Sequence, residues 1–253
     1  DPTQTRLVTG LLEDGVDPRL SGAEVASLDQ LGFATSGGSQ LSAVASDGST
    51  GSPIFFDVFQ DVVLRQGSAP ASGVTTDTGL PGFPVSFGAW NASAANPALL
   101  QPDAANPSVT TPVTSNVFWL TMTAPTNLPT GRVYNFINGP NVISSVGAGS
   151  GGSAVFVSSV SANLDFANGA LTGGNMVVFD GNNWNVNFSG SVNGPTFNAT
   201  LDPGSLINSS PTAAGTLTGG VTGANAEGMG AVFDFRDTNP TGDFVNGAFF
   251  ARP

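Results

Sequence analysis

Three reactive residue types are missing from this chain of 253 residues, which has no cysteine, no histidine and no lysine. Without cysteine it has neither disulfides nor thiolate metal sites. Without histidine it lacks the usual general base and the commonest transition-metal ligand. Without lysine, Schiff-base chemistry and Lys–Asn isopeptide crosslinks are excluded. Catalysis would have to use carboxylates, Ser, Thr or the single tyrosine, Tyr134, so we expect no enzyme and no cofactor.

Charge is also scarce, at 9% of the residues, compared with about 25% in ordinary globular domains. Six arginines face eighteen acidic residues, which gives a net charge of −12. An acidic surface of this kind repels nucleic acid and anionic lipid. We therefore expect another protein as the partner, with further copies of the chain among the candidates.

The chain contains no apolar run long enough for a signal peptide or an integral membrane span. It begins at Asp1 rather than Met, which suggests a processed or trimmed mature form. Lysine-free, cysteine-free sequences rich in Asn, Thr and Gly are typical of bacterial extracellular proteins. The composition thus indicates a secreted or cell-surface protein.

Residues 1–84 are predicted to form an irregular N-terminal extension. Ser21-Gly-Ala-Glu24 has the Ser-x-x-Glu spacing of a capping box and predicts one short helix, with a plain turn as the alternative. Ile54–Leu64 is apolar and rich in β-branched residues, which predicts one strand. A turn-rich linker with three prolines follows at 66–84.

Period-2 alternation is the strongest pattern in the chain. In Ala154–Phe166 apolar side chains recur at every second position, as a strand with one buried face requires. Asn168-Gly169, Asp180-Gly181 and Asn193-Gly194 suit tight hairpins. Such strands, with a long surface loop at 91–115, predict an all-β fold in which 85–253 forms an antiparallel up-and-down β-barrel of about eight strands. The predicted strands lie at 85–90, 116–123, 132–137, 154–166, 185–193, 196–201, 216–222, 229–236 and 245–251.

The polar positions of these strands carry Asn, Ser, Thr and Asp, and the apolar positions mix Phe, Leu and Val with Gly and Ala. A soluble barrel filled by its own side chains accounts for this pattern. An outer-membrane barrel, whose apolar positions face lipid, is the alternative.

Four stretches of the chain resemble known β-barrels. Leu217–Phe235 (LTGGVTGANAEGMGAVFDF) is similar to the end of the barrels in transferrin-binding protein B-like lipoproteins, where a Gly-rich strand leads through a Gly-x-x-Ala-Glu-x-x-Gly turn. Val85–Trp90, Phe118–Thr126 and Leu128–Tyr134 resemble the C-terminal barrels attached to some FecR-domain proteins. The resemblance covers about 85–253 and implies a barrel displayed by a Gram-negative bacterium. It places Gly223, Asn225, Ala226, Glu227 and Gly230 on a structural turn.

The residues of that turn have a physical role of their own. Gly223 and Gly230 would allow positive φ and a tight reversal of the backbone. Glu227 would accept backbone N–H bonds or pair with an arginine, for which Arg132 and Arg236 are the candidates.

Few patterns in the sequence indicate a catalytic or metal-binding site. Asp77-Thr78-Gly79 matches the core of the aspartic proteases but follows polar residues, which favours an ordinary turn. Asp234–Asp243 gathers three Asp and one Asn and is the one stretch considered for calcium, which needs oxygen ligands. The three tryptophans are interpreted as core residues, and four glycosylation sequons as coincidence. They are Trp90, Trp119 and Trp184, and Asn91, Asn187, Asn198 and Asn208.

Two functions follow from these observations. The first is a non-catalytic structural or adhesive subunit that self-assembles when an N-terminal strand completes a neighbour's sheet. The alternative is a surface binding module that captures a host or nutrient protein, with loop 91–115 as its contact surface. The alternative for this strand is that it packs against its own barrel. The possible assembly strand consists of Ile54, Phe55, Phe56, Val58, Phe59, Val62, Val63 and Leu64.

Overall fold

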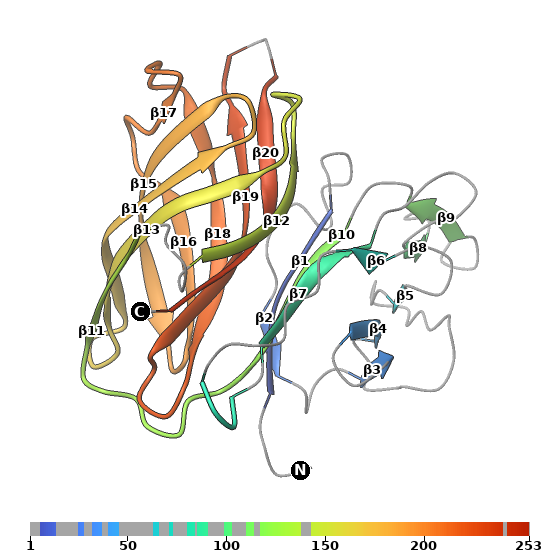
Figure 1. Cartoon of the computed structure of the whole chain (residues 1–253), viewed down its shortest axis with the longest axis vertical. Coiled ribbons are helices and arrows are strands. Elements are labelled where there is room, and N and C mark those ends of the chain that lie inside the picture. Colours follow the sequence, from blue (N-terminus) through green and yellow to red (C-terminus); the bar gives the residue numbers. More distant parts are fainter. Residues whose placement is uncertain are drawn as a thin grey trace.

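A computed structural model of the chain is drawn in Figure 1. It describes residues 6–13, 25–27, 32–36, 40–45, 63–65, 71–72, 80–83, 85–90, 99–102, 110–113, 117–137, 143–239 and 242–252. The regular structure in these residues is entirely β, and the strands pair antiparallel, which confirms the predicted fold class. Within this part of the chain, no helix has the length and apolarity needed to cross a membrane.

A ten-stranded sheet curls into an incomplete barrel, called the barrel below, on the left of Figure 1. Most neighbouring strands are joined by hairpins, and Gly169, Gly181 and Gly194 have positive φ at the turns that the Asn-Gly and Asp-Gly pairs predict. The strand order is β11 (Arg132–Ile137), β13 (Phe156–Asp165), β14 (Ala170–Phe179), β15 (Asn183–Asn193), β16 (Thr196–Leu201), β18 (Ala213–Thr222), β19 (Gly228–Asp237), β20 (Phe244–Ala251) and β12 (Ile143–Gly149), with β17 (Leu206–Ile207) paired to β15.

The two edges of this sheet meet at a seam. β11 pairs with residues 159–164 of β13, and β12 pairs with β20. β12 also reaches the start of β13, where the backbone N–H of Val157 donates to Ser145 Oγ at 3.2 Å. The strands next to each other in sequence, β11 and β12, therefore lie at opposite ends of the strand order.

Large apolar side chains fill the interior of the barrel. In β15 the inward Trp184, Val186 and Phe188 are fully buried and alternate with exposed asparagines. The barrel is thus apolar inside and polar on the outer face of β15, the reverse of a porin-type barrel. The largest buried side chains of the interior are Trp184, Phe188, Phe197, Phe233, Phe235 and Phe249.

A second sheet packs on the outside of the barrel at β18–β20. Its order is β2 (Val25–Ser27), β1 (Arg6–Glu13), β10 (Val117–Thr123), β7 (Val85–Trp90) and β6 (Ala71–Ser72). Phe87, Leu120 and Met122 from this sheet form one cluster with Val232 and Phe250, which point outward from the barrel. This covering explains why β19 and β20 are buried on both faces.

The position of β7 and β10 corrects the predicted extent of the barrel. Residues 85–90 and 117–123 pair with each other, and β10 pairs with β1, so the sheet of the barrel begins at β11. Alternation identified these strands but could not identify their partners, because pairing depends on contacts distant in sequence. The division into domains at residue 85 stays a prediction.

A third sheet has the order β3 (Gly32–Ser36), β4 (Gln40–Ala45), β5 (Val63–Arg65), β8 (Leu99–Pro102) and β9 (Thr110–Val113). β8 and β9 correct the predicted loop at 91–115, since prolines are tolerated at strand ends and edges. Of the predicted strand Ile54–Leu64, only Val63 and Leu64 lie in the described residues, in β5 between β4 and β8.

The predicted short helix after Ser21 is wrong where it can be checked. Val25–Ser27 forms β2, which pairs with Leu7–Thr9 of β1. A Ser-x-x-Glu pattern specifies a single turn, and here the backbone groups that follow it are paired in a sheet instead. Ser21 and Glu24 themselves lie outside the described residues.

Candidate functional site

The turn between β18 and β19 contains the predicted motif. Gly223 has φ +96°, and a Cβ atom there would collide with Glu227 Oε2. The Glu227 carboxylate accepts the backbone N–H of Asn225 at 2.8 Å and its Nδ2 at 3.1 Å. Partial burial acts to raise the pKa of Glu227, but the bonds from Asn225 and the nearby Arg132 guanidinium outweigh it and lower the pKa.

Two residues of this motif behave differently from the prediction. Ala226, and not Gly230, is the second residue of the turn with positive φ, at +58°. Gly230 lies in β19, where a Cβ atom would meet Met122 Cε at 2.8 Å and Leu120 Cδ2 at 2.9 Å. Its missing side chain therefore makes room for the second sheet, which the sequence could not indicate.

The same turn is held by residues from β11. Arg132 Nη1 donates to the Asn225 carbonyl at 3.1 Å, and the Tyr134 hydroxyl donates to the Ala226 carbonyl at 2.6 Å. Burial raises the pKa of Tyr134 strongly, opposed by the charge of Arg132 and reinforced by that of Glu227. These bonds tie the turn to β11, an edge strand of the sheet, which is a structural role.

A second polar cluster is centred on Asp180, which is fully buried at the β14–β15 hairpin. Oδ1 accepts Trp184 Nε1 and the Asn182 backbone N–H, each at 3.0 Å. Oδ2 accepts the Gly151 backbone N–H at 3.0 Å, which joins the hairpin to the β12–β13 connection. The Asp180-Gly181 pair predicts this hairpin, but nothing in the sequence indicates that the carboxylate is buried.

The three acids of Asp234–Asp243, two in β19 and one just before β20, have separate partners. Asp234 pairs with Arg236 at 3.2 Å, Asp237 accepts the Asn239 N–H at 2.8 Å, and Asp243 accepts Ser150 Oγ at 3.0 Å. Among the described residues, no three acids converge in the way a metal ion needs. We therefore do not propose calcium binding at Asp234–Asp243.

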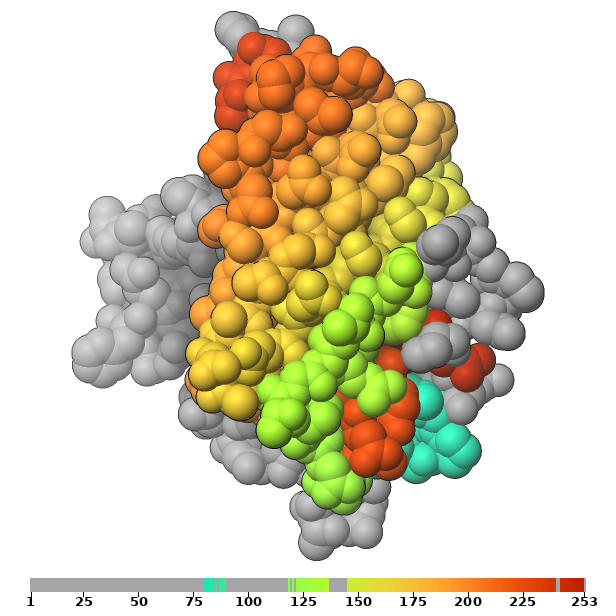
Figure 2. Space-filling view, turned by 90° about the vertical axis from the view of Figure 1, so that its left-hand side faces the viewer, coloured from blue at the N-terminus to red at the C-terminus, as the bar shows by residue number. Residues whose placement is uncertain are grey.

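The outer wall of the barrel, defined as the outward side chains of β13–β16, is polar and almost free of charge. Asp165, at the end of β13, is the single charged residue of these four strands. Figure 2 looks onto this wall, whose strands run from yellow to orange. Polar side chains cover it in cross-strand rows, such as Ser161, Asn175 and Asn187.

Hydrogen bonds fix the amide side chains of this wall. Asn175 Nδ2 donates to Asn185 Oδ1 at 3.0 Å and to Asn187 Oδ1 at 3.1 Å. Both acceptor amides thus turn their oxygen toward Asn175, which leaves their Nδ2 groups as donors for other molecules. An amide row held in this way presents donors in fixed positions.

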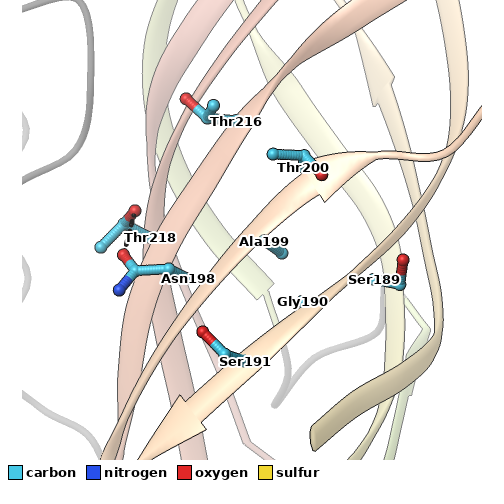
Figure 3. Close-up of a pocket in the computed structure, with 8 residues that line it drawn as sticks. All are labelled: Ser189, Gly190, Ser191, Asn198, Ala199, Thr200, Thr216 and Thr218. Atoms are coloured by element: carbon cyan, nitrogen blue, oxygen red, sulfur yellow. Dashed lines mark hydrogen bonds between the residues drawn. The ribbon is translucent and has the colours of Figure 1, made fainter.

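A groove of about 530 Å³ continues the wall over β15, β16 and β18 (Figure 3). Its lining has hydroxyl and amide groups but no charge. Thr218 Oγ1 donates to Asn198 Oδ1 at 2.8 Å, so two of these side chains hold each other in place. Gly190 brings β15 close to β16, because a Cβ atom would collide with the Asn198 carbonyl oxygen. The lining consists of Ser189, Gly190, Ser191, Asn198, Ala199, Thr200, Thr216 and Thr218.

The tryptophans, the sequon asparagines and the Asp-Thr-Gly motif named from the sequence lie in different parts of the chain. Trp184 is a core residue of the barrel. Asn187 and Asn198 lie on the outer wall, and Asn208 has φ +47° beside β17. Asp77-Thr78-Gly79, Asn91 and Ile54–Val62 lie outside the described residues, as do the side chains of Trp90 and Trp119.

No family model matches this chain, and no curated protein matches it. The solved structures that are similar to it include two of transferrin-binding protein B. One is a mutant of transferrin-binding protein B from Haemophilus parasuis Hp5, with 13% identity and a TM-score of 0.41, covering 97% of this chain and 44% of that one. The other is isotype 1 transferrin-binding protein B from serogroup B Neisseria meningitidis, with 11% identity and a TM-score of 0.33, covering 79% and 40%. This chain therefore spans less than half the length of either protein.

Proposed function

We propose that this chain is a non-catalytic binding module, secreted or displayed at the cell surface, that contacts its partner through the outer wall of the barrel. The supporting observation is an exposed polar face that is almost free of charge. The chain has eighteen acidic residues and six arginines, yet β13–β16 carry only Asp165. Charged residues keep surfaces from associating, so a large uncharged polar face is suited to contact.

The rest of the barrel supports the same assignment. Its interior is filled by side chains, so the barrel has the build of a scaffold rather than of a ligand-carrying calyx. The face at β18–β20 is covered by the second sheet. Among the described residues, the outer wall is a broad face of the barrel that the second sheet does not cover.

The acidic side chains support a non-catalytic role. Asp180 is buried against three donors, Asp234 pairs with Arg236, and Glu227 is bound by Asn225. Each has a structural partner, whereas catalytic carboxylates need an open position for substrate.

Self-assembly through Ile54–Leu64 receives less support. Val63 and Leu64 lie in β5, which has a strand paired on each side within the chain. Addition to a neighbour's sheet needs an unpaired edge. The binding module is therefore the function we carry forward.

The test compares two variants of equal charge. Asn185→Asp/Asn187→Asp adds two charges to the outer wall but keeps the oxygens that accept Asn175 Nδ2. Thr126→Asp/Asn127→Asp adds the same charge to the exposed β10–β11 connection. Beads coated with each full-length protein are applied to epithelial cell layers, cellulose and agarose. Retention on at least one surface, lost only in the wall variant, supports the proposal; no retention anywhere, or equal retention by both variants, contradicts it.

A further inference from the structure

Two phenylalanines are exposed on the outer wall. They lie next to the asparagine row, defined as Asn183, Asn185 and Asn187 of β15. Phe156 in β13 and Phe179 in β14 are direct cross-strand partners, with 40% and 46% of their surface exposed. Large aromatic side chains usually lie inside a protein. Phe179 in turn pairs with Asn183, the first residue of the row that continues through Asn185 and Asn187.

We propose that this part of the wall binds a neutral oligosaccharide, with the Phe156–Phe179 pair as its stacking platform and the asparagine row as its hydrogen-bonding edge. The inference rests on the proposed function and names its ligand class. A pyranose ring has an apolar face of C–H groups, which packs on an aromatic ring, and hydroxyls around its rim, which need donors and acceptors. The wall offers both on adjacent strands.

The absence of charge favours a neutral sugar over an anionic one. An anionic glycan would need arginine or lysine at the site, but the four strands of the wall contain neither. The net charge of −12 further repels anionic chains.

The same face fits a protein partner less well. Protein interfaces have a continuous apolar core in which aromatic residues, Met and Arg are enriched. Here two phenylalanines lie beside asparagines and serines, and the groove beyond them is lined by small polar residues. A second copy of the chain would also bring its own net negative charge.

The wall is long enough for an extended ligand. Outward residues of β15 run from Asn183 through Asn187 to Ser189, where the groove of about 530 Å³ begins. Six residues of strand span about 20 Å. A chain of several sugar rings could therefore contact the aromatic pair at one end and the groove at the other.

The test is an array of neutral, anionic and cationic oligosaccharides probed with the full-length protein, followed by calorimetry on the best ligand. We expect binding to a neutral glycan, and an affinity at least tenfold lower for Phe156→Ala/Phe179→Ala. Val133→Ala removes a 76% exposed side chain elsewhere on the barrel and should change affinity less than twofold. Thermal unfolding of each variant separates lost binding from lost folding.

Other outcomes would overturn the inference in distinguishable ways. Binding only to charged glycans refutes the ligand class, and equal binding by Phe156→Ala/Phe179→Ala refutes the aromatic platform. If no glycan binds but the wall variant Asn185→Asp/Asn187→Asp still loses retention on a surface, the wall is a contact face for another class of partner. If that variant retains full adhesion, the proposed function falls as well.

Discussion

Replacing Asp180 by asparagine tests whether the buried carboxylate holds the β14–β15 hairpin to the β12–β13 connection. The three donors, from Trp184, Asn182 and Gly151, need acceptors on both oxygens. Asparagine offers one oxygen and one NH2 group, so in either orientation at least one donor faces another donor.

The magnitude follows from that mismatch. Loss of one hydrogen bond to a charged group costs about 1.5–3 kcal/mol, and an unsatisfied buried donor costs about 1–3 kcal/mol. We therefore expect Asp180→Asn to lower the free energy of unfolding by about 3–5 kcal/mol, or the melting temperature by roughly 10 °C or more. The lower net charge acts in the opposite direction, so it cannot produce this loss.

The assay is thermal and urea unfolding followed by circular dichroism and by tryptophan fluorescence, to which the buried Trp184 contributes together with Trp90 and Trp119. Asp165→Asn is the matched control, because Asp165 makes hydrogen bonds within an exposed turn and should tolerate the change much better. A melting temperature for Asp180→Asn within 2 °C of the wild type would refute the reasoning, since the cited bonds could not then stabilise the fold.

Three further predictions concern the β18–β19 turn and its surroundings. Because burial raises the pKa of Tyr134, the one tyrosine of the chain, absorbance at 295 nm should show no phenolate above pH 10 until alkaline unfolding. The lowered pKa of Glu227 stabilises the fold above pH 4.5, the ordinary pKa of the group, and this stabilisation is lost as the pH falls through the pKa of the folded state. Glu227→Gln should therefore melt at a lower temperature than the wild type at pH 7, and the two melting temperatures should converge in acid. Gly230→Ala should cost about 1–3 kcal/mol in urea unfolding through contact with Met122, and an unchanged midpoint would contradict that packing.

The strands of the barrel could be predicted where one face is buried and the other exposed. The alternation in Ala154–Phe166 predicted β13, but a register shift between Val157 and Ser159 places Phe156 on the exposed face instead of the predicted buried one. Asp180-Gly181 predicted the β14–β15 hairpin. β14 escaped because Gly173 and Gly174 coincide with register shifts toward both neighbouring strands, which interrupts the alternation.

Contacts between sheets were harder to foresee. The outward Val232 and Phe250 make β19 and β20 apolar on both faces, a pattern that indicates a covering layer but does not identify it. The outer wall could in principle have been predicted, because the polar positions of β13–β16 carry no charge except at Asp165. Which of those positions converge into a groove depends on the curvature of the sheet.

The strand order also has a consequence for how the chain folds. β12 pairs with β20, so that Ile143 lies opposite Ala251, while β11, just before β12, pairs with β13. A chain emerging from the ribosome must therefore leave β12 without its partner until all the intervening strands have been made. Ordering so long a loop before the pairing forms is slow, and the waiting edge is able to pair with another molecule. Folding of this barrel should thus depend on protection of β12 during synthesis.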